Sequence, residues 1–269
     1  MESLLLPTNI KFTAGERPNE GVLTVEPCTP GYGTTIGNAL RRVLLSSLSG
    51  AAITSVKIRG VDHEFSTMDN VKEDVLEIIL NLKLVRVKLH SDEPVKIRLE
   101  SKGDGVVTAK DFEKNADVEV VNPDQVICSL TDKNASFELE ATISPGRGYR
   151  STEERLNEKM DLGEISIDAL FSPVTNVSYK VTPTRVGDKT DFDKLTLEIE
   201  TDGTIDPIEA CNQSVNVLLD HLNLLKDINY SEEIPEIEET EADEESEVEE
   251  PPADEAGEEP EAESTDETE

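Results

Sequence analysis

The chain has 269 residues, of which 36% are hydrophobic, and its formal net charge at pH 7 is −34. Residues 231–269 contain 21 of the 59 Asp and Glu and none of the 25 Lys and Arg, so 38 acidic and 25 basic residues precede them. A chain this negative does not condense on DNA by itself, which excludes a free-standing basic nucleic-acid-binding protein.

The cysteines are odd in number and far apart, at Cys28, Cys128 and Cys211. None belongs to a Cys-x-x-Cys pair, which argues against both a disulfide framework and a zinc site. No signal segment opens the sequence, and no apolar run approaches the length of about 18 residues that a membrane helix needs. We expect a soluble protein in a reducing, intracellular compartment.

Residues 21–26 predict an edge strand, which leads into a glycine-rich loop and a first helix. Thr34 or Thr35 is expected to cap this helix at Ile36. Its apolar residues cover about half of the helix circumference: Ile36, Ala39, Leu40, Val43, Leu44 and Leu48. This is more apolar surface than one packed side requires. We therefore predict that the helix packs in its own core on one side and against a second chain on another.

From residue 50 onward, short alternating runs indicate sheet, and a second helix is expected from a cap at Asp69 or Asn70 to Leu82. We predict an α+β fold in which residues 50–174 form an inserted β-rich module. The module interrupts a two-part dimerisation domain, residues 1–49 and 175–230, which is built from sheet and two long helices. Residues 231–269 read as a disordered acidic tail.

The second long helix has a clear predicted start, with Asp206 as N-cap, Pro207 at the first helical position and Glu209 completing a capping box. We expect it to end near Asp227. One apolar stripe is predicted to face its own core: Ile208, Cys211, Val215, Leu218, Leu219, Leu222 and Leu225. A second stripe repeats every seven residues and is predicted to face a partner: Ala210, Val217 and Leu224. The alternative is a helix buried all round in a single domain.

Catalytic motifs are missing from the sequence. The glycines of GYGTTIGNA lack the spacing and the Lys of a phosphate-binding loop, and no Ser lies in a GxSxG elbow. His63, His90 and His221 stand far apart without an i, i+4 partner, so we expect no metal site. These observations favour a binding or assembly protein over an enzyme with its own active site.

A series of ordered motifs carries a resemblance to a known family: GYGTTIGNALRRVLLSS, VDHEFSTMDNVKEDVLEIILNLK, VICSLTDKNASFEL, GRGY, IDALFSPV and DGTIDPIEA. Over residues 1 to about 230, the chain resembles the alpha subunits of bacterial-type DNA-directed RNA polymerase. The resemblance implies a homodimeric scaffold that takes up the beta subunit and then beta-prime for transcription. Nucleotidyl transfer with magnesium would belong to those large subunits, and this chain would be a non-catalytic part of the enzyme without a cofactor of its own.

Site residues follow from two sources. The resemblance implies a beta contact at Arg42 and beta-prime contacts at Lys83 and Ile167. The apolar stripes, and not a family motif, predict the dimer contacts, which are Ile36, Val43, Val217 and Leu224. The competing interpretation is a solvated charge for Arg42 and plain core packing for Ile167 and the four dimer residues.

The C-terminal region departs from the family pattern. Most members carry a small helical domain that binds promoter DNA, whereas this sequence continues as a polyanion, so we expect DNA contact only through the assembled enzyme. The tail either meets basic protein surfaces or only adds solubility. The alternative functions are a free-standing homodimeric binding protein acting through its tail and a stand-alone enzyme. The expected location is the bacterial cytoplasm, with an organelle as the alternative.

Overall fold

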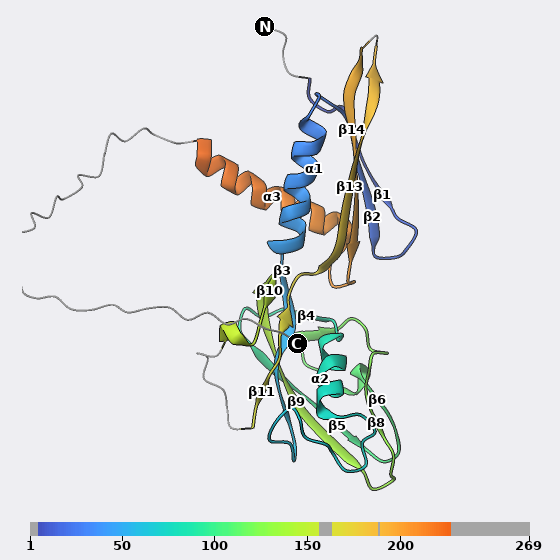
Figure 1. Ribbon diagram of the computed structural model, residues 1–269, viewed down its shortest axis with the longest axis vertical. Helices are drawn as coiled ribbons and strands as arrows, with labels where there is room; N and C mark the ends of the chain where they lie inside the picture. The colour runs from blue at the N-terminus through green and yellow to red at the C-terminus, as the bar shows by residue number, and fades with distance from the viewer. Residues whose placement is uncertain (1–4, 156–162, 188, 227–269) are drawn as a thin grey trace, which may run out of the picture. The chain divides into compact units, whose positions relative to one another are not determined.

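The computed structural model describes residues 5–155, 163–187 and 189–226 (Figure 1). Within these ranges the chain forms three α-helices, two short 3-10 helices and antiparallel sheets. This mixture confirms the predicted α+β class. The predicted acidic tail lies outside the described residues.

The first sheet has the strand order β1-β2-β14-β13. Its strands are β1 (Asn9–Ala14), β2 (Glu20–Cys28), β13 (Val174–Val186) and β14 (Lys189–Thr201). Residues 21–26 form part of the strand β2, as predicted, but β2 is not an edge strand, because β1 pairs with it from Asn9 opposite Glu26 to Ala14 opposite Gly21. The strand β1 was not predicted, so the outer side of β2 was expected to be open.

Two helices, α1 (Tyr32–Ser46) and α3 (Pro207–Lys226), pack against this sheet (Figure 1). Alternation along β2 and β14 turns their apolar residues to the helices. The resulting hydrophobic cluster consists of buried residues from the sheet, the helices and the chain next to them: Leu23, Val25, Cys28, Leu40, Leu44, Leu48, Val174, Val177, Leu195, Leu197, Ile199, Ala210 and Cys211. One face of the sheet is thereby removed from water.

The start of α1 differs from the prediction. The helix begins at Tyr32 rather than Ile36, and no side chain of its own caps it; its N-cap is Gly31, with φ of 85°. The carboxylate of Asp193 on β14 accepts hydrogen bonds from the N–H groups of Gly31, at 2.8 Å, and Gly33, at 3.3 Å. An anion at this end also suits the helix dipole. Because Asp193 is distant in the chain, the local pattern of threonines could not reveal this cap.

The start of α3 is as predicted for Asp206 and Pro207. The Asp206 carboxylate accepts a hydrogen bond from the Ile208 N–H at 3.2 Å, and Pro207 is the first helical residue. The predicted capping box with Glu209 is wrong, because the Glu209 carboxylate accepts from the Gln213 side chain at 3.4 Å instead. The predicted end at Asp227 falls outside the described residues, which include the helix up to Lys226.

The second sheet has the strand order β11-β3-β9-β5, and three two-stranded sheets accompany it. Their strands are β3 (Ser49–Ile58), β4 (Val87–Leu89), β5 (Val95–Lys102), β6 (Gly105–Thr108), β7 (Val118–Val120), β8 (Val126–Leu130), β9 (Ser136–Arg147), β10 (Tyr149–Arg150), β11 (Ile165–Ser166) and β12 (Ala169–Leu170). The 3-10 helices are η1 (Ala109–Asp111) and η2 (Glu153–Arg155). This region is rich in sheet, as the alternating runs predicted.

The helix α2 (Val75–Lys83) begins later than predicted. Asn70 has φ of 64°, in the left-handed region, and Val71 forms a bridge to Leu130, so the chain is not helical there. The residues that α2 buries are Val75, Ile78, Ile79 and Leu82. They belong to a second hydrophobic cluster, whose buried members run from Ile53 to Ile167. The domain boundaries proposed from the sequence stay a prediction.

Gly50 and Gly146 lie directly opposite each other on β3 and β9. A Cβ atom at Gly50 would lie 1.9 Å from the backbone oxygen of Phe171, and one at Gly146 would lie 2.7 Å from the ring of the same residue. Phe171 is itself buried, at 3% exposure. Both glycines are therefore required by the close approach of this residue.

We expect Gly50→Ala to lower the free energy of unfolding by about 1–3 kcal/mol, because the methyl group would have to displace backbone. Denaturant unfolding measures the change. Ser49→Ala, at an exposed position of the same strand, serves as control and should change it by less than about 0.5 kcal/mol. Equal stability of the two variants would contradict this packing.

Candidate assembly surfaces

Two adjacent arginines of α1 have different roles. The Arg41 Nε donates a hydrogen bond to the Val177 carbonyl oxygen at 3.1 Å, which ties α1 to β13. Arg42 is exposed, and within the described part of the chain its guanidinium forms no hydrogen bond or ion pair. A guanidinium offers five N–H donors in a fixed plane. Arg42 can therefore bind a carboxylate or carbonyl group of another protein.

The two predicted dimer residues of α1 are half-buried. Ile36 packs partly against the cluster beneath α1. The residues that α1 buries fully are Gly33, Gly37, Leu40 and Leu44. Ile36 and Val43 thus keep part of their apolar surface in water.

The predicted core stripe of α3 is largely wrong. Cys211 is buried and Leu218 packs partly against the core, but five members are exposed: Ile208, Val215, Leu219, Leu222 and Leu225. The residues that α3 buries are instead Pro207, Ala210, Cys211 and Ser214. Ala210, which was predicted to face a partner, is completely buried in its own chain. All four buried residues belong to the first half of the helix, and Leu218 of the second half packs partly against the same core.

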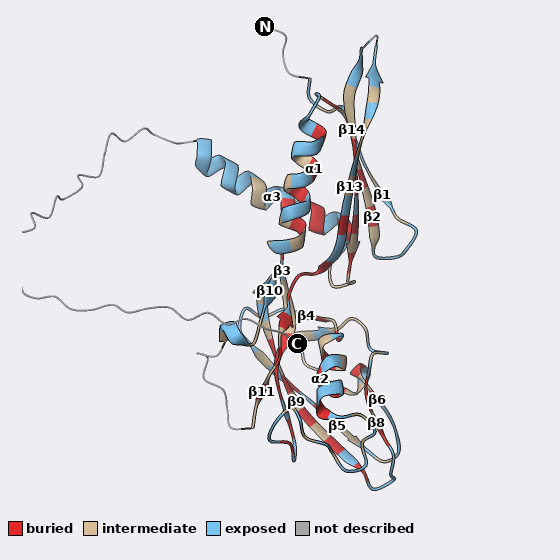
Figure 2. Ribbon diagram, viewed as in Figure 1, coloured by how far each residue is buried: buried red, intermediate tan, exposed pale blue. Residues whose placement is uncertain are grey.

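The second half of α3 leaves apolar side chains uncovered (Figure 2). Leu222, Leu224 and Leu225 are 58%, 78% and 59% exposed. Val217 is half-buried. On a helical wheel Leu224 and Leu225 lie about 100° apart, so the exposed apolar surface is wide. We call the second half of this helix, residues 217–226, the open half of α3.

Lys83, at the end of α2, forms an ion pair with Asp168. The Lys83 Nζ lies 3.0 Å from Asp168 Oδ2, and both side chains are about one-third exposed. The Thr152 N–H donates to Asp168 Oδ1 at 2.9 Å. This backbone hydrogen bond, followed by the Lys83 ammonium, lowers the pKa of the Asp168 carboxyl. Sequence reasoning missed Asp168, although it directly follows Ile167.

Ile167 is buried, with 1% exposure, and belongs to the second cluster. Its N–H donates to the Thr54 carbonyl oxygen at 2.9 Å. The structure therefore brings Lys83 and the Ile167 segment together through Asp168, with the Ile167 side chain itself facing the core.

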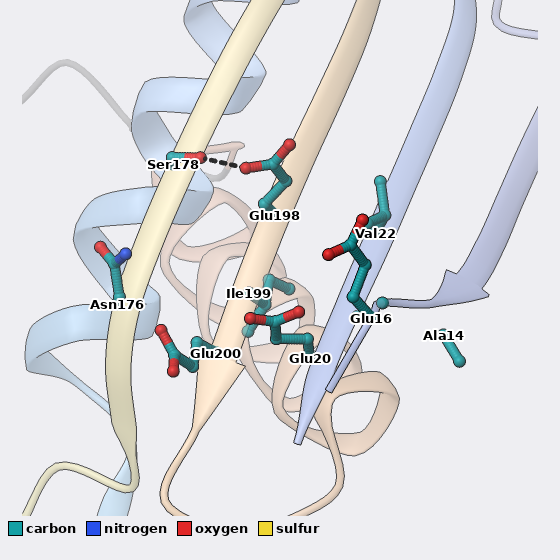
Figure 3. A pocket seen from close by; sticks show the side chains of 11 residues that line it. Ala14, Glu16, Glu20, Val22, Asn176, Ser178, Glu198, Ile199 and Glu200 are labelled. Carbon is teal, nitrogen blue, oxygen red and sulfur yellow. Dashed lines mark hydrogen bonds between the residues drawn. The ribbon is translucent and has the colours of Figure 1, made fainter. Parts of the chain in front are cut away.

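An acidic groove of about 500 Å³ lies on the first sheet (Figure 3). Four carboxylates line it, those of Glu16, Glu20, Glu198 and Glu200. Arg17 forms ion pairs with Glu20 at 3.4 Å and Glu200 at 3.0 Å. The Ser178 hydroxyl donates to Glu198 at 2.8 Å. These contacts pair Glu20, Glu198 and Glu200 with groups of the same chain. Ser178 and Glu198 form a single hydrogen-bonded pair, and the residues that line the groove include no histidine.

Among the described residues, no group of three or more His, Cys, Asp and Glu is arranged to hold a metal ion. The three cysteines are free and buried, and desolvation raises the pKa of the Cys128 thiol to about 12. None of the described helices has the length and apolar content that crossing a membrane requires.

One part of the chain matches a known family of protein domains. Residues 56–172 match the family described as the RNA polymerase Rpb3/RpoA insert domain. This stretch contains nearly all of the second cluster and both partners of the Lys83–Asp168 ion pair. An insert domain of this class is therefore present.

Whole-chain relatives define the family more closely. The chain is 53% identical over 204 residues to the DNA-directed RNA polymerase subunit alpha of Alkaliphilus oremlandii, covering 76% of this chain and 64% of the relative. The subunit alpha of Symbiobacterium thermophilum is 51% identical over 218 residues, covering 81% and 68%. That of Moorella thermoacetica is 50% identical over 223 residues, covering 82% and 71%. The chain belongs to the family of DNA-directed RNA polymerase alpha subunits and spans about two thirds of the length of these relatives.

The Asp168 carboxyl should titrate below pH 3.8, its ordinary pKa, because Thr152 and Lys83 both stabilise the charged form. A lowered pKa in the folded state contributes stability above about pH 4, and this contribution is lost as the pH falls through the folded pKa. Carboxyl chemical shifts followed by NMR measure the midpoint. In Lys83→Ala the midpoint should rise while staying below 3.8, and a midpoint at or above 3.8 in the unaltered chain would contradict the geometry.

Proposed function

We propose that the chain is the homodimeric scaffold on which the beta and beta-prime subunits of an RNA polymerase assemble in the cytoplasm. One observation carries the proposal, namely the open half of α3, which presents leucines to water. Nucleotidyl transfer and its magnesium would belong to the large subunits, and DNA would be reached only through the assembled enzyme. This chain would contribute assembly and no catalytic residue.

Burial energetics support a second copy as the partner of α3. Fully burying one leucine side chain stabilises by about 1.5–3 kcal/mol. A two-fold interface uses the same surface of both copies, so each leucine of the open half counts twice. Ile36, Val43, Val217 and Leu224 are the proposed contacts, and all four retain exposed apolar surface.

The proposed domain division has similar support. The first cluster draws on residues 23–48 and 174–211, whereas the second draws on residues 53–167. These limits agree closely with a dimerisation domain of residues 1–49 and 175–230 and an insert of residues 50–174. The insert would then be free to contact a large subunit while the helices hold the second copy.

We propose one contact residue for each large subunit. Arg42 is proposed to bind beta because its exposed guanidinium has no hydrogen bond within the described residues, whereas the Arg41 guanidinium donates to the Val177 carbonyl oxygen of β13. Lys83 is proposed to bind beta-prime together with the segment at Ile167. Because Ile167 is buried, its part would be to hold that segment in place.

Co-expression with the two large subunits, followed by capture on a tag at the N-terminus of this chain, tests the proposal. We expect recovery of both large subunits with two copies of this chain. A version that stops at residue 230 should capture them equally well, because the scaffold precedes the acidic tail. Recovery of neither large subunit by the full chain would overturn the proposal.

Leu224→Asp should weaken the dimer by roughly 100-fold or more, because the interface would bury an unpaired carboxylate. Sedimentation over a range of concentrations measures the dissociation constant. Asn216→Asp adds the same charge on the polar side of α3 and is the matched control. An unchanged dimer in Leu224→Asp would remove Leu224 from the interface.

Arg42→Ala should leave the dimer intact and reduce beta capture about tenfold, because a hydrogen bond to a charged group contributes roughly 1.5–3 kcal/mol. Titration of the beta subunit against the immobilised dimer gives the affinity. Arg59→Ala, which removes an exposed arginine of the insert, should have little effect. Monomers instead of weakened capture would move Arg42 into the dimer interface.

A further inference from the structure

We propose that Asp168 is a positioning residue for the beta-prime contact, which aims the Lys83 ammonium at a carboxylate or carbonyl oxygen of that subunit. The inference rests on the proposed function, because it names the chemistry of the same contact. It assigns a role to a residue that neither the sequence motifs nor the apolar stripes singled out.

Asp168 joins three separate segments of the chain. Its Oδ2 accepts from Lys83 Nζ at 3.0 Å, at the end of α2. Its Oδ1 accepts from the Thr152 N–H at 2.9 Å, in the chain that follows β10. Asp168 itself lies between β11 and β12. Each carboxylate oxygen thus has a donor, so rotation of the carboxylate would break a hydrogen bond.

The backbone at Asp168 is held on its N-terminal side. Ile167 donates its N–H to the Thr54 carbonyl at 2.9 Å and buries its side chain in the second cluster. Arg155 Nη1 donates to the carbonyl oxygens of Thr54 at 2.9 Å and Ile167 at 3.4 Å. The position of the carboxylate is therefore fixed by its backbone, and Ile167 acts through Asp168 without reaching a partner.

The ammonium of Lys83 has more N–H donors than its hydrogen bond to Asp168 uses. An ammonium carries three N–H groups, and within the described residues it donates to Asp168 alone. The Lys83 side chain is 32% exposed, so a partner can reach it. A lysine held by one carboxylate loses rotamer freedom before a partner arrives, which lowers the entropic cost of binding. Its remaining N–H groups suit an oxygen acceptor.

Exposed apolar residues lie close along the chain to both members of the ion pair. Leu84 follows Lys83 and is 51% exposed, and Leu170, two residues after Asp168, is 46% exposed. Tyr149 lies opposite Leu170 in the β10–β12 pair and is 60% exposed. Apolar groups around a polar contact exclude water from it, which strengthens the charged interaction. The ammonium is therefore placed for a contact that a partner would desolvate.

Capture of beta-prime by the assembly of this chain with beta tests the proposal. We expect Lys83→Ala and Asp168→Asn each to lower the affinity about tenfold, with dimer formation and beta capture unchanged. Glu140→Gln is the matched control, because Glu140 forms ion pairs with Lys96 and Arg98 elsewhere in the insert. It should leave beta-prime capture unaltered.

The double variant Lys83→Asp with Asp168→Lys separates positioning from folding. The double variant restores an ion pair but moves the ammonium to residue 168. We therefore expect its thermal stability to exceed that of either single variant, while its capture of beta-prime stays low. Recovery of both would overturn the proposal, because Asp168 would then only hold the fold. Weak capture in Lys83→Ala with full capture in Asp168→Asn would overturn it while leaving the proposed function standing. Full capture in both single variants would overturn the beta-prime assignment of Lys83 itself.

Discussion

The helix α3 extends beyond the core of its own chain, and this extension sets what the rest of the molecule must do. The helix buries Ala210, Cys211 and Ser214 against the chain and then continues with leucines that remain in water. A helix end with this much exposed apolar surface costs free energy in a lone molecule and is stabilised once a second surface covers it. Two-fold pairing supplies such a surface without any further gene product.

Some polar contacts fix the fold, and two of them hold the elements that carry Arg42 and Lys83, the cations we propose for a partner. Asp193 on β14 caps the start of α1, and Arg41 forms a hydrogen bond from the same helix to β13. With α1 fixed at its start and along its length, Arg42 is presented from a rigid helix. In the insert, Asp168 holds the Lys83 side chain directly through an ion pair. Preorganised cations of this kind lower the cost of association because their side chains are already ordered.

Local patterns predicted the α+β class, most strands of the insert and the start of α3. Alternation and helix caps depend on residues that are close together in the sequence. They failed where a distant residue decides the outcome: Asp193 replaces a threonine cap, and β1 covers the side of β2 that looked like an edge. Which side of α3 faces the core also depends on tertiary packing. Periodicity therefore identified the apolar residues of the helix but assigned the wrong ones to the core. Ile167 and Lys83 were named separately, and Asp168 between them became visible only in three dimensions.

The mass of the isolated chain in solution shows whether a second copy covers α3. Light scattering at micromolar concentration, without any large subunit, should give twice the chain mass of 29.6 kDa, because the open half of α3 would be covered by a second copy. A stable mass of 29.6 kDa over the whole concentration range would contradict the account, since the exposed leucines would then need no partner of their own kind.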